Sequence, residues 1–201
     1  MKPARTLPLA LVLTATAATI ASAATVNLRP YALQPSDVGG ARPVYDRPQT
    51  GIPKVFRAAA TRRFSSARAG GSVYKLNQDL YLATSPYFSR AVYRQLLGVE
   101  LPKTLKGVAA SIKLTKTVQR PWKVGTGEES GGRLLEGSTT TAQPGVPKGT
   151  RVRVYVAAVR IGSALTVLTA FPQGGEAATA ESGLRVIVTR AAKREARLGT
   201  R

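Results

Sequence analysis

The chain has no cysteine and no histidine, and its acidic and aromatic residues are scarce. Without cysteine it forms no disulfide, thiolate nucleophile or Cys/His zinc site, and without histidine it has no imidazole general base. Aromatic residues make up 6% of the 201 residues, which leaves few large side chains for a core. The side chains left for chemistry are hydroxyls, carboxylates and cations. We therefore expect no cofactor, no bound metal and no catalytic residues.

The first 24 residues have the order typical of a secretory signal peptide. Lys2 and Arg5 precede an apolar run over residues 7–20, and an Ala-Ser-Ala cleavage motif follows at 21–23. The alternative is an uncleaved anchor, because the apolar stretch is only just long enough to span a bilayer. The pattern predicts an extracytoplasmic protein, secreted or associated with the cell envelope, with no transmembrane segment after cleavage.

Positive charge dominates the composition. Lys and Arg number 30 against 10 Asp and Glu, for a formal net charge of +20. Such an imbalance indicates polyanionic partners. An anionic membrane surface or an anionic polymer is expected, whereas a nucleic acid is disfavoured because of export and because no zinc-finger or helix-turn-helix pattern is present.

Residues 25–69 are expected to form an extended, Pro/Arg-rich basic arm, because prolines and glycines recur through their first half. Within the arm, the apolar spacing of residues 55–69 indicates a short basic amphipathic helix. Its role would be adsorption to an anionic membrane or polymer, and the alternative is an arginine-solvated segment laid over the domain. The predicted anion-binding residues are Arg57, Arg62, Arg63 and Arg68.

Residues 70–201 are expected to form one α+β domain, an antiparallel sheet with one or two helices packed on one face. Alternating apolar residues predict strands, and a 3.6-residue period predicts helices. Ser85-Pro86 is a typical start for the first helix, and Gly98 a typical end. The expected strands are 72–83, 108–118 and 132–142 with a hairpin over 151–171, and the expected helices are 85–97 and 177–197.

Four features in this order resemble a group of uncharacterised secreted bacterial proteins: the helix 85–97, the loop 124–130 with Glu128 and Glu129, the hairpin with Arg160-Ile161-Gly162 at its turn, and the closing helix. At a greater distance they are similar to PsbP-like and related extracytoplasmic sensor folds. The resemblance implies a signal peptide and an α+β fold, and it implies no catalytic residues.

Three local patterns resemble or contain groups used in chemistry. Ser72-Val73-Tyr74-Lys75 matches S-x-x-K, but a strand would direct Ser72 and Lys75 to opposite faces, and the partner motifs of penicillin-recognising enzymes are missing. Glu128 and Glu129 are expected to neutralise nearby Lys123 and Arg133. Trp122, the sole tryptophan, is expected in the core or at the domain edge.

Together these patterns favour an exported, non-catalytic module of the cell envelope that binds an anionic partner or a small ligand. The alternative is a hydrolase-type enzyme that uses hydroxyl and carboxylate chemistry, or a nucleic-acid binder.

Overall fold

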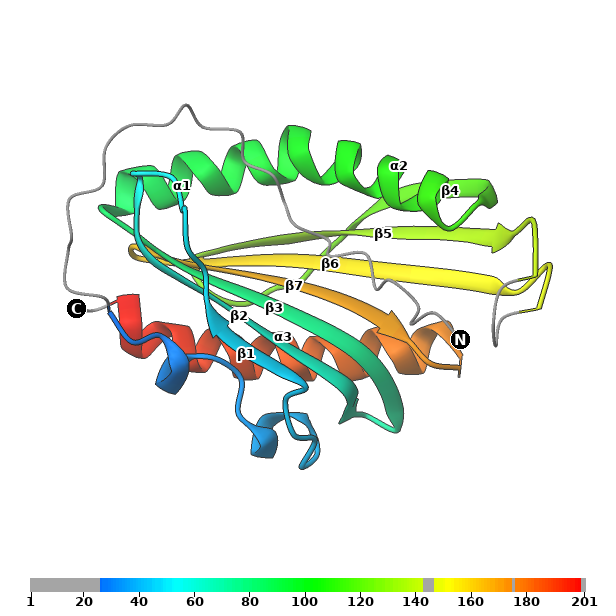
Figure 1. Ribbon diagram of the computed structural model, residues 1–201, viewed down its shortest axis with the longest axis horizontal. Coiled ribbons are helices and arrows are strands. Elements are labelled where there is room, and N and C mark those ends of the chain that lie inside the picture. Colours follow the sequence, from blue (N-terminus) through cyan, green and yellow to red (C-terminus); the bar gives the residue numbers. More distant parts are fainter. Residues whose placement is uncertain (1–25, 143–146, 175, 200–201) are drawn as a thin grey trace.

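Seven antiparallel strands form a single sheet in the order β1-β2-β3-β7-β6-β5-β4 (Figure 1). The computed structural model describes residues 26–142, 147–174 and 176–199, so the predicted signal peptide lies outside the described residues. The strands are β1 (Tyr45–Pro48), β2 (Phe56–Ala69), β3 (Ser72–Ala83), β4 (Leu114–Trp122), β5 (Glu129–Thr139), β6 (Arg151–Ile161) and β7 (Ala164–Pro172). The α+β class expected from the sequence is confirmed.

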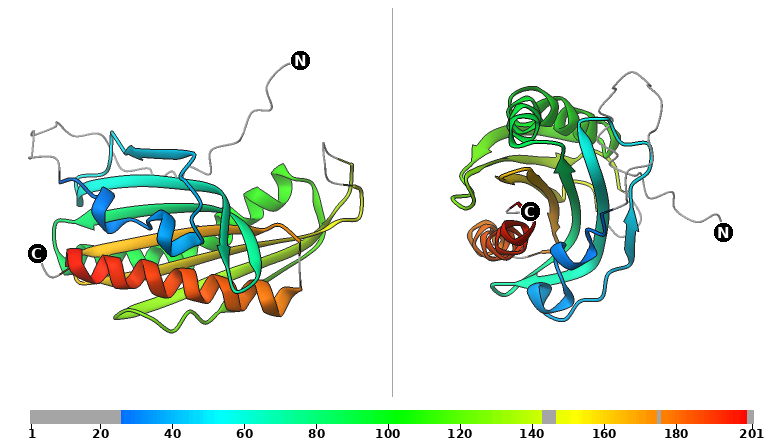
Figure 2. Two further views of the ribbon diagram at one scale, coloured as in Figure 1. Left: turned by 90° about the horizontal axis from the view of Figure 1, so that it is seen from below. Right: turned by 90° about the vertical axis from the view of Figure 1, so that its left-hand side faces the viewer.

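Helices cover both faces of this sheet, not one. Figure 2 shows the sheet curving around α3 (Ala177–Gly199), with α1 (Pro86–Gln95) and α2 (Leu101–Ser111) on the opposite face. On β6, Tyr155 and Val159 pack in the core beneath α3, whereas Val154 and Val156 pack beneath α1 and α2. The expectation of helices on a single face was wrong, because a helical period shows that a helix has an apolar side but not which face of the sheet that side covers.

Residues 56–69 form the 14-residue strand β2, paired with β1 and β3, and not an amphipathic helix in an arm outside the domain. The register shifts twice along the pairing with β3, between Phe56 and Ala58 and between Phe64 and Ala67. Each such irregularity interrupts the strict alternation of a strand. Apolar residues that belong to one extended strand therefore take a spacing that resembles a helical period.

The first helical run continues well past its predicted end at Gly98. Ser85 caps α1 as expected, since its hydroxyl accepts a hydrogen bond from the Phe88 amide at 3.3 Å. A π-helical segment, η3 (Leu96–Glu100), then joins α1 to α2 without a break. Residues 108–111 therefore belong to α2, and the strand predicted over 108–118 begins only at Leu114.

The predicted hairpin over 151–171 and the closing helix are both confirmed, as β6, β7 and α3. The β2–β3 hairpin holds α3 closely. The Tyr74 hydroxyl donates to the Ala180 carbonyl at 2.6 Å. At Gly183 a Cβ atom would lie 2.3 Å from the Ala69 carbonyl oxygen, so only glycine permits the helix to pack this near the strand.

Replacing Leu184 by Asp should lower the free energy of unfolding by about 3 kcal/mol or more, because a carboxylate would be buried without a partner. Leu184 is 1% exposed in the core beneath α3. The matched control is Val186→Asp on the same helix, where the side chain is 39% exposed. Urea unfolding measures both, and equal losses would show that the assigned face of α3 is wrong.

Candidate functional site

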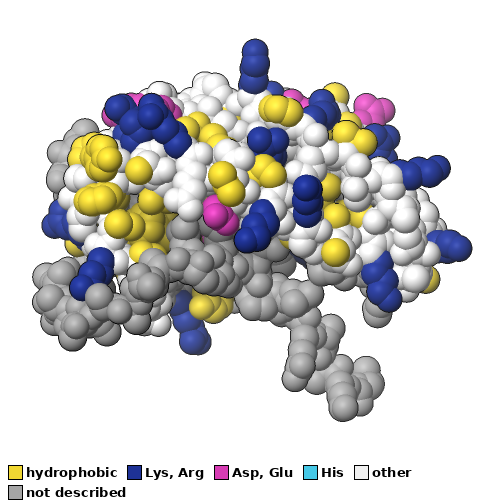
Figure 3. All heavy atoms as spheres, turned by 90° about the horizontal axis from the view of Figure 1, so that it is seen from above, with side chains coloured by type: hydrophobic (Ala, Val, Ile, Leu, Met, Phe, Trp, Pro, Cys, Tyr) yellow, Lys and Arg dark blue, Asp and Glu magenta, His cyan; other side chains and the backbone are white. Residues whose placement is uncertain are grey.

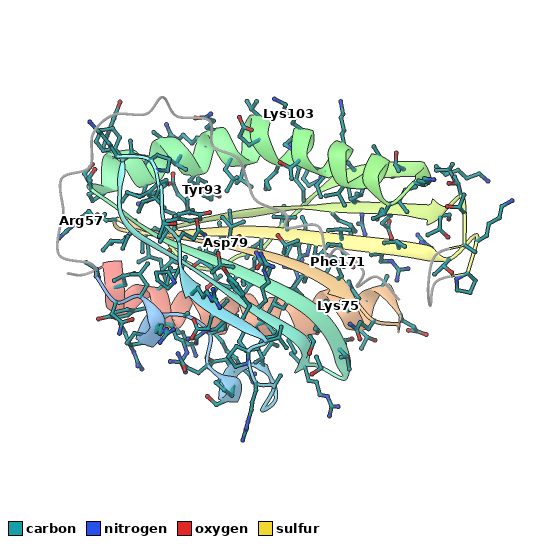
Figure 4. All side chains as sticks on the ribbon, in the orientation of Figure 1. Arg57, Lys75, Asp79, Tyr93, Lys103 and Phe171 are labelled. Carbon is teal, nitrogen blue, oxygen red and sulfur yellow. The ribbon has the colours of Figure 1, made fainter. Side chains whose placement is uncertain are left out.

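The four arginines predicted to bind anions all lie on β2 but do not form one surface. Side chains alternate along a strand, and Arg57 and Arg68 are separated by roughly 35 Å at a rise of about 3.3 Å per residue. Arg57 is exposed at one end of the sheet, where it lines a cavity of about 390 Å³ beside the N-terminal segment (Figure 4). Arg68 is exposed near the other end of the strand.

Arg62 is turned into the protein, where it is 5% exposed. Its guanidinium binds the Asp46 carboxylate at 2.7 Å and donates to the Leu33 carbonyl at 2.6 Å. Arg63 is half-buried, lies 4.8 Å from the centre of the Tyr45 ring and donates to Asn77 at 3.1 Å. These two guanidiniums serve internal contacts, which leaves Arg57 and Arg68 as the exposed members of the set.

Replacing Arg62 by Met should lower the free energy of unfolding by about 2–4 kcal/mol, because Asp46 and the Leu33 carbonyl would lose a buried partner. Arg57→Met, an exposed position on the same strand, should change it by no more than about 0.5 kcal/mol. Chemical denaturation of both variants checks this. An Arg62→Met variant with the same free energy of unfolding as the parent would mean that the interior contacts of Arg62 do not stabilise the fold.

Arginine and lysine have separate roles in this protein. Every ion pair found within the described residues uses an arginine, and six of the ten carboxylates take part: Asp37, Asp46, Glu128, Glu129, Glu136 and Glu181. The nine lysines in the same part of the chain are all exposed and none belongs to an ion pair. A guanidinium suits paired, desolvated positions, whereas an ammonium is strongly hydrated. The uncompensated charge at the surface is therefore largely lysine.

These free lysines gather on α2 and at the start of β4. No acidic residue occurs between positions 101 and 127. The buried face of α2 includes Leu101 and Leu105, whereas Lys103 and Lys106 are exposed. Lys103 points away from the sheet (Figure 4). Figure 3 shows the side of the molecule that carries α1 and α2, where blue cations outnumber the acidic side chains. We call the group formed by Lys103, Lys106, Lys113 and Lys116 the basic face.

Exposed apolar side chains lie in the same helical layer. Tyr87 at the start of α1 is 76% exposed, and Val99 in η3 is 60% exposed. Phe88 is partly exposed and its ring packs edge-on against Tyr87 at 5.6 Å. The helical run from Pro86 to Ser111 thus presents aromatic and aliphatic groups followed by two lysines. This combination is typical of peptide segments that lie at a lipid–water interface.

The two short motifs that carried the family resemblance contact each other. Arg160, at the turn of the β6–β7 hairpin, is 1% exposed. It donates to Glu129, to Glu128 at 2.7 Å and to the Gly162 carbonyl at 2.9 Å. Glu129 also pairs with Arg90 of α1 at 3.4 Å. The expectation that these carboxylates pair with Lys123 and Arg133 was wrong. A buried guanidinium without an anionic partner costs more free energy than an exposed cation without one, so the carboxylates pair with Arg160.

Asp79 of β3 lies among neutral donors on the face that α2 covers (Figure 4). Its carboxylate accepts hydrogen bonds from the Thr61 hydroxyl at 2.6 Å, from Asn77 at 2.8 Å and from Gln49 at 3.1 Å. Burial raises the pKa of Asp79, and these hydrogen bonds and the charge of Arg63 oppose the rise. The carboxylate therefore joins β2, β3 and the segment after β1.

The S-x-x-K pattern places no lysine beside a serine. Ser72 is buried, whereas Lys75 is exposed on the other face of β3, as the strand pattern predicts. Within the described residues no three His, Cys, Asp or Glu side chains are grouped so that they could hold a metal ion.

Glu195 of α3 is fully buried. Burial raises the pKa of Glu195 well above its ordinary value. The Thr166 hydroxyl, the Ile161 backbone and the charge of Arg160 oppose this rise, while the charge of Glu128 adds to it. Sequence reasoning missed this residue, because its helical position alone does not distinguish a buried carboxyl from an exposed one.

Replacing Glu195 by Gln should stabilise the protein increasingly as the pH rises. Between the unfolded-state pKa of about 4.3 and the raised folded-state pKa, the folded parent protein binds one more proton than the unfolded chain. The free energy of unfolding of the parent therefore falls by about 1.4 kcal/mol for each unit by which the pH rises. The Glu195→Gln variant has no carboxyl group at this position to titrate, so it does not lose stability in this way. Its melting temperature should match that of the parent near pH 4 and exceed it at pH 8.

The control for this pH dependence is Glu176→Gln, which removes the same charge from an exposed position just before α3. It should show no trend of that size. A Glu195→Gln variant less stable than the parent at pH 8 would show that the fold stabilises the ionised carboxylate.

Comparisons of the chain with protein-family models, with curated protein sequences and with solved structures find no match. A function for this chain therefore follows from its own geometry and charge.

Proposed function

We propose that this protein is an exported, non-catalytic module of the cell envelope that binds an anionic membrane surface through its basic face. The observation that carries the proposal is the separation of charge: carboxylates are largely engaged by arginines, while four lysines of α2, of the turn after it and of β4 stay exposed and form no ion pair. Each lysine near an anionic membrane contributes about 1 kcal/mol to binding.

The exposed apolar side chains in the same helical layer as the basic face favour a lipid surface over a soluble polymer. Tyr87, Phe88 and Val99 would enter the headgroup region while Lys103 and Lys106 meet the anionic lipids. Within the described residues no helix is long and apolar enough to cross a bilayer. The binding proposed here is therefore peripheral.

The same lysines could attract a nucleic acid, but no exposed aromatic side chain lies among them for stacking on bases, because Tyr87 and Phe88 are at the start of α1, far along the helical run from the lysines. The single aromatic residue between positions 101 and 127 is Trp122, which is buried. Binding of single-stranded nucleic acids usually adds such stacking to the attraction of the backbone charge. A membrane partner accounts for more of the observed surface.

Reversing the basic face should abolish most vesicle binding. The variant Lys103→Glu, Lys106→Glu, Lys113→Glu and Lys116→Glu is compared with the parent in co-sedimentation with vesicles of phosphatidylglycerol and phosphatidylcholine. Four lost contacts of about 1 kcal/mol each predict at least roughly 100-fold weaker binding at low salt. Parent binding should fall steeply toward 0.15 M salt, where exposed charges are screened over about 8 Å.

The matched control reverses four other exposed, unpaired lysines: Lys54, Lys75, Lys148 and Lys193. It has the same net charge as the first variant and should keep most of the vesicle binding. Equal losses in both variants would show that net charge, and not the basic face, drives association. Binding to anionic wall polymer without binding to vesicles would overturn the choice of partner.

A further inference from the structure

A second group of cations lies on the other face of the sheet, beside α3. Three arginines of β4 and β6 share the carboxylate of Glu136 on β5. Its oxygens lie 2.9 Å from Arg153 Nε, 3.2 Å from Arg151 Nη2 and 4.0 Å from Arg120 Nε. One negative charge cannot balance three guanidiniums, so the group keeps an excess of positive charge and several unused N–H donors.

Two buried donors come from the same strands as these arginines: Trp122 from β4 and Tyr155 from β6. Trp122 and Tyr155 pack edge to face with ring centres 5.5 Å apart. The Trp122 indole nitrogen and the Tyr155 hydroxyl are both buried, and neither has a hydrogen-bond partner among the described residues. Nearly all buried polar groups in native proteins find such a partner, so two neighbouring exceptions require an explanation.

The backbone and α3 hold both rings in place. Trp122 pairs in register with Gly132, where a Cβ atom would lie 2.8 Å from the indole ring. From α3, the Arg185 guanidinium lies 5.4 Å from the centre of the Trp122 ring and also pairs with Glu181. Burial raises the pKa of Tyr155, and the charges that act on its hydroxyl are those of Glu181, Arg153, Glu136 and Arg120. The hydroxyl and the arginines thus belong to one electrostatic environment.

We propose that Arg120, Arg151 and Arg153, together with the Tyr155 hydroxyl and the Trp122 indole N–H, bind a phosphate group. A phosphate monoester carries about −1.5 to −2 charges and three acceptor oxygens, which matches the excess charge and the unused donors. Planar guanidiniums bind such oxygens in pairs. Arg120 and Arg151 are accessible to a ligand, with side chains 54% and 64% exposed. This site is separate from the basic face and does not depend on it.

Trp122 makes the site directly observable, because it is the sole tryptophan of the chain. Intrinsic fluorescence is followed while inorganic phosphate is added, against sodium chloride at the same ionic strength. We expect a saturable change with phosphate and none with chloride. The double variant Arg120→Gln, Arg151→Gln should bind at least about tenfold more weakly, since it loses two charge-assisted partners. The control Arg68→Gln, Arg197→Gln removes two other exposed charges and should bind like the parent.

The variant Tyr155→Phe separates binding from packing. It removes the hydroxyl oxygen and keeps the ring. Because the hydroxyl has no partner in the protein, the melting temperature of the variant should not fall. Phosphate binding should nevertheless weaken. Unchanged phosphate affinity in Tyr155→Phe would remove the hydroxyl from the site.

Vesicles that contain phosphatidic acid distinguish a lipid headgroup from free phosphate as the source of the group. Competition between these vesicles and inorganic phosphate at Trp122 would assign the site to a headgroup, and phosphate binding without competition would assign it to a soluble phosphate. A fluorescence response no larger than that to chloride, or an equal loss in the Arg68/Arg197 control, would overturn the phosphate site. Neither result would affect the vesicle test of the basic face.

Discussion

The burial of the β6–β7 hairpin from both sides is the constraint on which the rest of the structure depends. Residues 154–160 of β6 and 164–170 of β7 are buried without interruption. A strand pair of this kind needs a helical layer on each face, which α3 and the α1–α2 run supply. The hairpin also carries Arg160 into the interior, so a loop with two glutamates must close over it. The burial of this hairpin therefore requires the internal ion pairs of Arg160 as well as the two helical layers.

The small number of carboxylates then determines which positive charges remain unpaired at the surface. Most of the few acidic side chains engage arginines that the fold has partly or wholly desolvated, as Asp46 engages Arg62 and Glu128 engages Arg160. Lysines receive no such partner in the described part of the chain. The sheet edge at β4 separates two basic surfaces of different character: flexible lysines by α2, and guanidiniums around Glu136 beside α3. The first suits a diffuse anionic surface and the second a compact anion.

Strong local signals in the sequence predicted their elements correctly. Alternation located β3 and the β6–β7 hairpin, and the Ser85-Pro86 cap located the start of α1. The failures had physical causes that lie beyond single-segment patterns. Bulges in β2 disguised its period, and the π-helical segment carried the chain past Gly98. Which arginines are exposed depended on the pairing of β2 with its neighbours. The continuous apolar run over 154–159 was an available signal that the sheet is covered on both faces.

The contacts at Glu136 illustrate what a sequence conceals. Arg120, Arg151 and Arg153 lie on two strands, and only the register of β4, β5 and β6 brings them to one carboxylate. The buried state of Trp122 was expected, whereas its partner Tyr155 and their unpaired donors were not.

The two outer strands of the open sheet affect whether copies of the protein associate through their sheet edges at high concentration. β1 has four residues and ends in Pro48, which offers no amide hydrogen to a neighbour. β4 is interrupted between Thr115 and Val118, and Lys116 at that point has a φ of 50°. A second copy that approached either edge would meet a missing donor, a distorted backbone or a like charge. Such edges keep an antiparallel sheet from growing between molecules, so the same lysines that favour an anionic surface also oppose fibril-like self-association.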